Sequence, residues 1–425
     1  MIPPSAEDVR RGHGRIAFRE ALSLISLPDK VAGDGKVIKR FMSQRSAWTP
    51  GLDFVPLVEE LGSVYTAPPS TYGGHVYSQS GLAASLSLTA AQKESSYNGS
   101  NKKLGIHTIN GFFSEAGRND RPFIYEVSNL ASNPSFPNLL VTVRQPTSPS
   151  TNQEGTHYPK ADADLPLGPV CFSAVLSFRS STISHVEAQE PPPQARFGEI
   201  LKSKQPMEWD PVPIADIDWI LARFPGARQA VGLFPGFEMR KVDMRAYNAG
   251  RPLHERRELM LHRLLAPLPT SPSAPTSTST ISSDENGKKS RDIEDGACEI
   301  GGPDAHICAH AYVCDRNGLL MIGNHVAELG GPEIASVASL SYSFVVHVDG
   351  EDAVVEYDED LEQQWWVQEA CFPRVQAGRG IIHSKIWSPR GVHVATMYQD
   401  GILRWKPKDY DEKTRAVNSR GAGRL

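Results

Sequence analysis

Alternating hydrophobic and polar positions predict long β-strands in both halves of the chain. In the first half, this pattern predicts strands over residues 108–113, 122–130, 137–145 and 169–179. In the second half, it predicts strands over residues 335–348, 351–358, 363–372, 380–387 and 392–405. Residues 388–391 read Ser-Pro-Arg-Gly, which is typical of a type I turn, so the last two strands are predicted to be neighbours.

One helix precedes most of the strands in each half. Residues 73–91 (GGHVYSQSGLAASLSLTAA) and about 304–315 (DAHICAHAYVCD) are mostly small and apolar, with few charges. A helix of that composition is normally surrounded by protein. A helix followed by strands, repeated once, favours an α+β double hot dog, in which two antiparallel sheets are each wrapped around a central helix. The order of elements alone also allows other α+β folds.

The length of 425 residues predicts two domains, because a single core stops growing below this size. We expect an N-terminal hot-dog domain over 18–185, a connector over 186–233 and a C-terminal hot-dog domain over 234–408. Residues 266–303 are rich in Ser, Thr and Pro and then charged, which predicts a disordered insertion. The similar tract 145–166 is predicted to be a mobile loop outside the core.

Composition narrows the class of protein. The chain is 40% hydrophobic and 22% charged with a net charge of -5, so it lacks the basic character of nucleic-acid-binding proteins. No apolar run approaches the roughly 18 residues that a membrane-spanning helix needs, and the first residues lack the apolar core of a secretory signal. Five cysteines without a CxxC pair indicate free thiols in a reducing compartment.

The final residues Gly423-Arg424-Leu425 are similar to the peroxisomal Ser-Lys-Leu address. Glycine at the first of these positions departs from that address. Peroxisome and cytoplasm are therefore the two predicted locations.

Three polar residues of the second half stand where a core would favour apolar side chains. Asp315 follows the apolar run ICAHAYVC at the C-terminal end of the predicted helix, where a carboxylate opposes the helix dipole. Ser339 lies on the polar side of a strand that has Tyr342 on its apolar side, and Gln399 interrupts another strand. A solvated aspartate, a solvent-facing stripe and an edge-strand glutamine would explain the same residues without a function.

The segments around these three residues resemble the acyl-CoA thioesterase II family. In the second half the matching segments are YVCDRNGLL around Asp315, IASVASLSYSFVVH around Ser339 and ATMYQDGILR around Gln399. In the first half they are YGGHVYSQSGLAA, IHTINGFFSEAG and PFIYEVSNLASNPSFPNLLVTVRQ. With the insertions set aside, the resemblance spans about residues 18–406.

The resemblance implies that Asp315, Ser339 and Gln399 hold the water that attacks a thioester carbonyl. In these roles Asp315 accepts the proton of the water, and Ser339 and Gln399 orient it. An amide suits this task because it donates and accepts hydrogen bonds without titrating. The resemblance implies no cofactor and no metal, because coenzyme A is part of the substrate, and it implies further assembly into homo-oligomers.

Three positions depart from the family pattern. Residues 341–343 read Ser-Tyr-Ser where the family usually has Asp-His-Ser. Residues 115–117 read Glu-Ala-Gly in place of Arg-Pro-Gly, and His75 stands where glutamine is usual. These departures leave the preferred acyl group and carrier open.

Other candidate sites have weaker support. His306 and His310 lie one helical turn apart near Cys308 and Cys314, but no acidic residue or second pair completes a zinc site. The pair of glycines before the first helix lacks the lysine of a phosphate-binding loop; it is predicted to allow close approach of helix and sheet. Cys371 has no evident His-Asp partners for nucleophilic catalysis.

The sequence therefore predicts an acyl-CoA thioesterase that releases a free fatty acid and coenzyme A. One alternative is a hot-dog thioesterase of a biosynthetic pathway that acts on an unusual acyl thioester. The other is a non-catalytic double hot dog that only binds acyl-CoA or a partner protein. The expected partner is the acyl-CoA substrate, with no nucleic acid and no membrane span.

Overall fold

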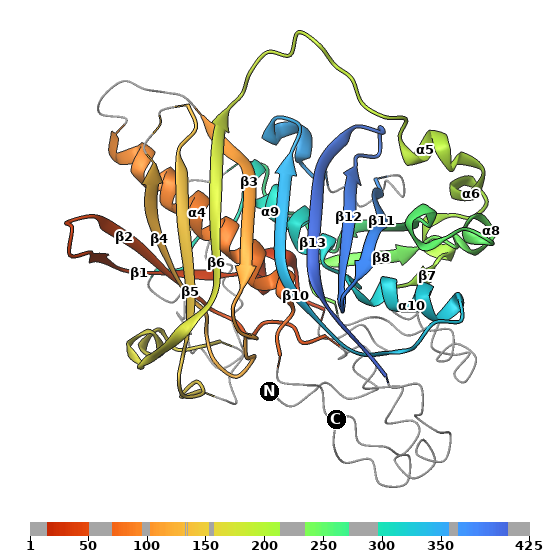
Figure 1. Ribbon diagram of the computed structural model, residues 1–425. Helices are drawn as coiled ribbons and strands as arrows, with labels where there is room; N and C mark the ends of the chain where they lie inside the picture. The colour runs from red at the N-terminus through yellow and green to blue at the C-terminus, as the bar shows by residue number, and fades with distance from the viewer. Residues whose placement is uncertain are drawn as a thin grey trace, which may run out of the picture.

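The described strands form one antiparallel sheet. The computed structural model describes residues 15–50, 70–95, 103–131, 133, 135–152, 157–212, 234–271, 296–356 and 364–406. The thirteen strands follow the order β1-β2-β4-β5-β6-β3-β10-β13-β12-β11-β9-β8-β7 (Figure 1). The strands are β1 (Leu24–Val31), β2 (Val37–Ser43), β3 (Leu104–Phe113), β4 (Ile124–Ala131), β5 (Asn138–Pro146), β6 (Leu167–Ser180), β7 (Asp210–Pro211), β8 (Phe237–Lys241), β9 (Glu258–Leu264), β10 (Ile334–Val346), β11 (Trp366–Gln376), β12 (Arg379–Trp387) and β13 (His393–Trp405).

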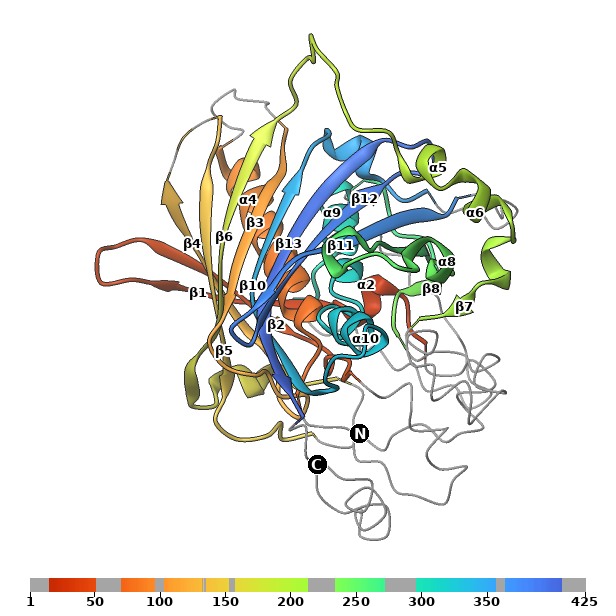
Figure 2. The same cartoon turned by 45° about the vertical axis from the view of Figure 1, so that its right-hand side comes forward.

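Two long helices, α4 and α9, lie on one side of this sheet in both ribbon views (Figures 1 and 2). They correspond to the two helices predicted from the sequence. The described helices are α2 (Phe18–Ala21), α4 (Gly73–Ser95), α5 (Pro193–Arg196), α6 (Gly198–Lys202), α8 (Arg245–Asn248), α9 (Pro303–Cys314) and α10 (Leu320–Glu328), with short 3-10 turns η3 (Lys160–Asp164), η4 (Pro206–Glu208), η7 (Leu253–Glu255) and η8 (Gly350–Ala353).

The two halves of the chain join where β3 pairs with β10. Ser343 of β10 lies opposite Asn110 of β3, and its hydroxyl donates to the Asn110 Oδ1 at 2.7 Å. The sheets of the two halves therefore pair edge to edge, and the backbone hydrogen bonds continue across the join and make one sheet. That each half wraps its own sheet around a central helix stays a prediction.

The helices α4 and α9 pack directly against each other under the join. Ser78 Oγ of α4 donates to the Cys308 carbonyl of α9 at 2.8 Å. A Cβ on Gly81 would lie 2.6 Å from Cys308 Sγ, so only glycine allows this approach. One core includes buried residues of both halves, and the sheet and both helices are therefore parts of one packing unit.

The predicted strand over residues 351–358 is wrong. Residues 350–353 form the 3-10 turn η8, and Ala353 and Val355 are buried against α9. The Val355 N–H donates to His306 Nδ1 at 3.1 Å, and His310 Nε2 lies 2.9 Å from the Ala353 carbonyl. The alternation of apolar residues therefore reflects packing on two core histidines, and it does not reflect pairing in a sheet.

The strands β1, β2, β7, β8 and β9 were missed by the sequence pattern. In β9, six of the seven residues are buried, so hydrophobic and polar positions do not alternate. Pro28 and Asp29 interrupt the hydrophobic pattern of β1. Strands at the margins of a sheet carry such irregular patterns more often than central strands do.

The tract 145–166 is packed where the structure describes it, which corrects the prediction of a loop outside the core. Asp162 is fully buried and accepts hydrogen bonds from Ser150 Oγ at 2.5 Å and Thr151 Oγ1 at 2.8 Å. Tyr158 packs in a small core with residues of β1, β2 and β4. Buried hydrogen bonds therefore order a segment that composition alone marks as loop.

The predicted insertion over residues 266–303 is described only at its ends. Leu268 and Ile300 are buried, and the Cys298 N–H donates to the Leu24 carbonyl at 2.8 Å. Residues 272–295 lie outside the described residues, as do residues 213–233 of the predicted connector and residues 423–425. The domain boundaries and the peroxisomal location stay predictions.

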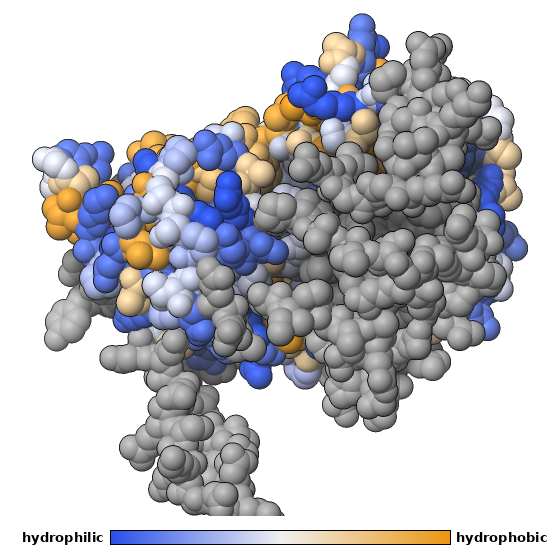
Figure 3. Space-filling model, turned by 90° about the horizontal axis from the view of Figure 1, so that it is seen from below, coloured by the Kyte–Doolittle hydropathy of each residue, from blue (hydrophilic) through white to orange (hydrophobic). Residues whose placement is uncertain are grey.

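The described surface seen from below mixes hydrophilic and hydrophobic residues (Figure 3). Among the described helices, none combines the length and the hydropathy needed to cross a bilayer.

The shared core predicts that both halves unfold together. Phe344 of β10 is fully buried at the join, so Phe344→Ala should lower the free energy of unfolding by about 3–5 kcal/mol. The change should appear in one cooperative transition in urea, followed by circular dichroism. Val175→Ala on β6, where the side chain is exposed, is the control and should cost less than about 1 kcal/mol. Two transitions, with only one shifted by Phe344→Ala, would contradict this prediction.

Candidate functional site

Asp315, Ser339 and Gln399 lie together in one hydrogen-bonded cluster. Gln399 Nε2 is 2.9 Å from Asp315 Oδ1 and 2.8 Å from Ser339 Oγ. Asp315 comes from the end of α9, Ser339 from β10 and Gln399 from the neighbouring strand β13. The three residues predicted from the sequence are therefore brought together.

The carboxylate of Asp315 lies between the ends of two helices. It follows the last residue of α9, where the carbonyl ends of the helix disfavour a negative charge. Its Oδ2 accepts the N–H of Gly74, in the first turn of α4, at 2.8 Å. The N-terminal end of α4 thus places the positive end of its helix dipole next to this carboxylate, whereas α9 presents the negative end of its own dipole.

Burial raises the pKa of Asp315 to about 6. The hydrogen bonds from Tyr342, Gly74 and Gln399 act in the opposite direction and lower this pKa, as does the charge of Arg316. A carboxylate with a pKa near 6 is mostly ionised at neutral pH and is a stronger base than an exposed aspartate.

A β-bulge in β10 places Ser339 in the cluster. The register between β10 and β13 shifts between Ser339 and Ser341, so the simple alternation of sides is interrupted there. Ser339 consequently faces the same side as Tyr342, although strict alternation puts these two residues on opposite sides. A bulge leaves no clear signature in a single sequence, so strict alternation predicts Ser339 on the side opposite to Tyr342.

Tyr342 is the fourth member of the cluster, and the sequence reasoning placed it in the core. Its hydroxyl contacts Asp315 Oδ1 and lies 2.8 Å from Ser339 Oγ and 2.9 Å from Gln399 Nε2. The only signal was the departure from the family pattern at residues 341–343. The hydrogen-bonded cluster therefore has four members, one more than the three residues predicted from the sequence.

The cluster has fewer donor hydrogens than pairs of polar atoms within hydrogen-bond distance. The Gln399 amide nitrogen has two hydrogens but lies within hydrogen-bond distance of three oxygen atoms, and the Tyr342 hydroxyl has one hydrogen for two acceptors. Gln399 Oε1 is buried and accepts no hydrogen bond from the described residues. The cluster therefore has one unused acceptor and can redistribute its donors when a substrate binds.

The cluster opens into a cavity of about 560 Å³. Its walls are mainly aromatic and aliphatic, and Glu115 and Arg316 add opposite charges. The Arg316 guanidinium is buried and lies 4.5 Å from the centre of the Trp48 ring. The apolar lining residues include Trp48, Tyr72, Phe113, Leu319 and Val337.

The other candidate residues lie elsewhere. His75 is buried near the Phe123 ring, and burial lowers its pKa to about 3. Cys371 has a histidine neighbour, since its Sγ is 3.8 Å from His383 Nδ1, but burial raises the pKa of the thiol. Neither residue lines the cavity that contains Asp315.

The histidines of α9 serve the core. Burial lowers the pKa of His306 to about 4 and of His310 to about 3, so both rings are neutral at physiological pH. Within the part of the chain that the structure describes, no group of three or more His, Cys, Asp or Glu residues is arranged to hold a metal ion.

The two halves repeat one arrangement with a nearly constant residue offset. Two contacts join equivalent positions, Ser78 to Cys308 and Asn110 to Ser343, and their partners are 230 and 233 positions apart. An offset of 230 relates residues of α4 to residues of α9. Gly74 then corresponds to Asp304 and Asp315 to Ser85, so the contact between Gly74 and Asp315 has its equivalent between Asp304 and Ser85. These two residues are also in contact, but with the donor reversed, because Ser85 Oγ donates to Asp304 Oδ2 at 2.5 Å.

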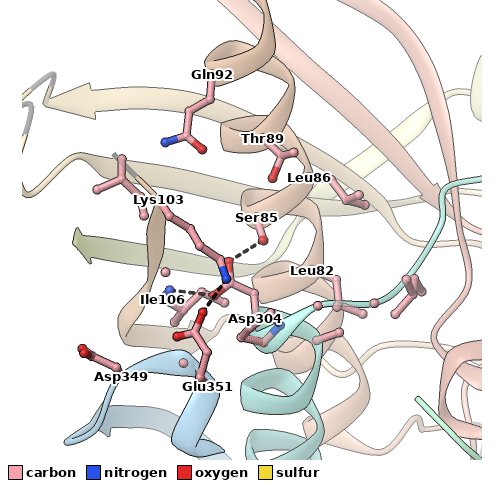
Figure 4. Close-up of a pocket in the computed structure, with 18 of the residues that line it drawn as sticks. Leu82, Ser85, Leu86, Thr89, Gln92, Lys103, Ile106, Asp304, Asp349 and Glu351 are labelled. Carbon is pink, nitrogen blue, oxygen red and sulfur yellow. Dashed lines mark hydrogen bonds and ion pairs between the residues drawn. The ribbon is translucent and has the colours of Figure 1, made fainter. Parts of the chain in front are cut away.

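A second cavity of about 500 Å³ lies at the equivalent place, around Ser85 and Asp304 (Figure 4). Ile106 corresponds to Ser339, and the register shift next to Ser339 recurs between Ile106 and Thr108. Leu176 pairs with Ile109 in the same way that Gln399 pairs with Tyr342, so Leu176 corresponds to Gln399.

Serine, isoleucine and leucine thus stand at the places of Asp315, Ser339 and Gln399. The second cavity therefore lacks the carboxylate and the amide at these equivalent places, although Asp304 and Gln92 line it at other positions.

Comparison with protein-family models and with curated proteins gave no match. Among solved structures, the chain is similar to an acyl-CoA thioesterase II from Mycobacterium marinum, with 18% identity over 92% of this chain and 98% of that chain and a TM-score of 0.47. It is also similar to a tesB protein from Mycobacterium avium subs paratuberculosis, with 16% identity over 86% and 92% of the two chains and a TM-score of 0.44. A protein of unknown function with a hot-dog fold from Alicyclobacillus acidocaldarius shares 14% identity over 92% and 98%, with a TM-score of 0.45.

The close approach of α4 to Asp315 predicts that Gly74 tolerates no side chain. A Cβ there would lie 2.8 Å from the backbone carbonyl oxygen of Tyr312, so the first turn of α4 must move away from Asp315. Gly74→Ala should destabilise the protein by about 1–3 kcal/mol in urea unfolding. It should also raise the pKa of Asp315, measured by NMR titration, because the N–H of Gly74 no longer stabilises the carboxylate.

The matched control is Gly33→Ala, because no other heavy atom lies within 4 Å of a Cβ at Gly33. It should leave both quantities nearly unchanged. An unchanged pKa of Asp315 in Gly74→Ala would show that the helix end does not stabilise this carboxylate.

Proposed function

We propose that this protein hydrolyses acyl thioesters with water as the nucleophile. The observation that carries the proposal is the meeting of a buried carboxylate, a hydroxyl and an amide at the wall of a largely apolar cavity. These groups can remove a proton from a water and fix its direction. The family resemblance of the sequence supports the same reaction.

In the proposed reaction, Asp315 accepts a proton from the water while the water oxygen forms a bond to the thioester carbon. The carbonyl oxygen becomes an oxyanion in the tetrahedral intermediate. Collapse of this intermediate restores the C=O bond and breaks the C–S bond, and the proton held by Asp315 passes to the leaving thiolate. The products are a carboxylic acid and a thiol, so no covalent enzyme intermediate and no cofactor is required.

The cavity walls suit an acyl chain, because aromatic and aliphatic side chains predominate. The lining residues indicate less about the thiol that carries the acyl group. Glu115 lines the cavity where the family has arginine, and its negative charge does not favour the phosphates of coenzyme A. We therefore propose acyl-CoA as the first substrate class to test, with acyl-pantetheine and acyl-N-acetylcysteamine beside it.

Thiol release from this substrate panel, with short, medium and long acyl chains, tests the proposal. Hydrolysis of the coenzyme A esters supports an acyl-CoA thioesterase. Hydrolysis of only the shorter carriers or of unusual acyl groups favours a biosynthetic thioesterase. Tight binding of acyl-CoA without thiol release favours the non-catalytic alternative.

Removal of the base should reduce turnover most. Asp315→Asn keeps the shape of the side chain but cannot accept the proton, so kcat should fall by about a hundredfold to ten-thousandfold. Gln399→Ala removes one orienting group and should cost about tenfold to a thousandfold. Ser339→Ala should also lower kcat, whereas Ser339→Thr keeps the hydroxyl. Cys371→Ser is the control and should leave kcat unchanged.

If folded Asp315→Asn retained near-normal turnover, water activation by this carboxylate would be wrong.

The rate should depend on pH through Asp315. Its carboxylate must be ionised to act as a base, and its pKa lies at about 6. The value of kcat/KM should therefore be constant above neutral pH and fall about tenfold per unit below pH 6. A profile of kcat/KM from pH 4.5 to 8.5 measures this, and a profile without an acid limb would exclude Asp315 as the base.

A further inference from the structure

The Tyr342 hydroxyl occupies the point where the three proposed catalytic groups meet. It contacts Asp315 Oδ1 and lies 2.8 Å from Ser339 Oγ and 2.9 Å from Gln399 Nε2. A water that accepts from Gln399, donates to Asp315 and contacts Ser339 would make the same three contacts. Two oxygen atoms cannot occupy one point, so the hydroxyl and such a water exclude each other.

The position of the hydroxyl is fixed by packing. Tyr342 is 2% exposed, and its ring centre lies 5.1 Å from that of Tyr77 and 5.5 Å from that of Phe113. Its backbone lies between β3 and β13, opposite Gly111 and Gln399. The side chain therefore has little room to turn away while the cavity is empty.

The hydroxyl does not itself suit the role of nucleophile. Burial and the nearby charge of Asp315 raise the pKa of Tyr342 well above its ordinary value, so the phenol is neutral. A neutral phenol that donates to Asp315 uses an acceptor that the attacking water needs.

We propose that Tyr342 is an internal competitor of the attacking water and limits the rate of hydrolysis. This inference rests on the proposed thioesterase activity. The water enters the cluster only in molecules whose Tyr342 hydroxyl has moved off Asp315, and turnover scales with the fraction of such molecules. Tyr342 stands where the family usually has a histidine. The larger phenol at this position is the departure that the proposal requires.

Tyr342→Phe tests the proposal, because it removes the hydroxyl and keeps the ring. We expect kcat for acyl thioester hydrolysis to rise about tenfold or more, since the water no longer competes for its place. The matched control is Tyr77→Phe. It removes a buried hydroxyl that donates to the Ile109 carbonyl at 2.6 Å, outside the cluster, and should leave kcat unchanged. The double variant Tyr342→Phe, Asp315→Asn should fall to the level of Asp315→Asn alone.

A second readout does not depend on activity. A crystal structure of Tyr342→Phe should show an ordered water within hydrogen-bond distance of Asp315 Oδ1, Ser339 Oγ and Gln399 Nε2. Tyr342→Leu serves the same two measurements if the phenylalanine variant does not fold.

A fall or no change in kcat of folded Tyr342→Phe would overturn the proposal, because the hydroxyl would then serve the reaction or be indifferent to it. Absence of the water at this point would also overturn it. If neither wild type nor variant hydrolyses any thioester but the water is present, the displacement by Tyr342 stands and the thioesterase activity fails.

Discussion

The burial of one carboxylate governs the arrangement of this molecule. Asp315 lies at the unfavourable end of α9, and its charge is compensated by the first turn of α4, by a phenol and by an amide. The compensation requires the two helices to lie side by side in opposite directions, and it requires β10 and β13 beneath them. Because α4 belongs to the first half and Asp315 to the second, neither half alone can hold this charge. The candidate site therefore forms only where the two halves are in contact.

Much of this arrangement followed from the sequence. The central helices and most long strands were predicted from small-residue content and alternation, and Asp315, Ser339 and Gln399 from short motifs. The presence of Tyr342 in the cluster was not predicted, because a local bulge shifts Ser339 onto the same side. Bulges depend on the partner strand, and a pattern read along one strand does not contain that information.

The other clear error was the strand predicted over residues 351–358. The sequence analysis also noted His306 and His310 as a histidine pair without further metal ligands. In the structure the two observations have one cause, since the histidines hold the backbone of residues 353–355 against α9. Polar groups on an apolar helix indicate a buried partner, and the sequence does not show whether that partner is a metal or a backbone carbonyl.

The join between β3 and β10 has a consequence for synthesis of the chain. Asn110 and Ser343 are 233 positions apart, so the ribosome completes the first half long before β10 exists. During that interval β3 is a ten-residue edge strand beside β6, and Phe112 on it is 59% exposed even in the finished protein. An open edge of this length is a template for pairing with other chains. The nascent first half therefore presents this edge to other chains until its own partner strand emerges.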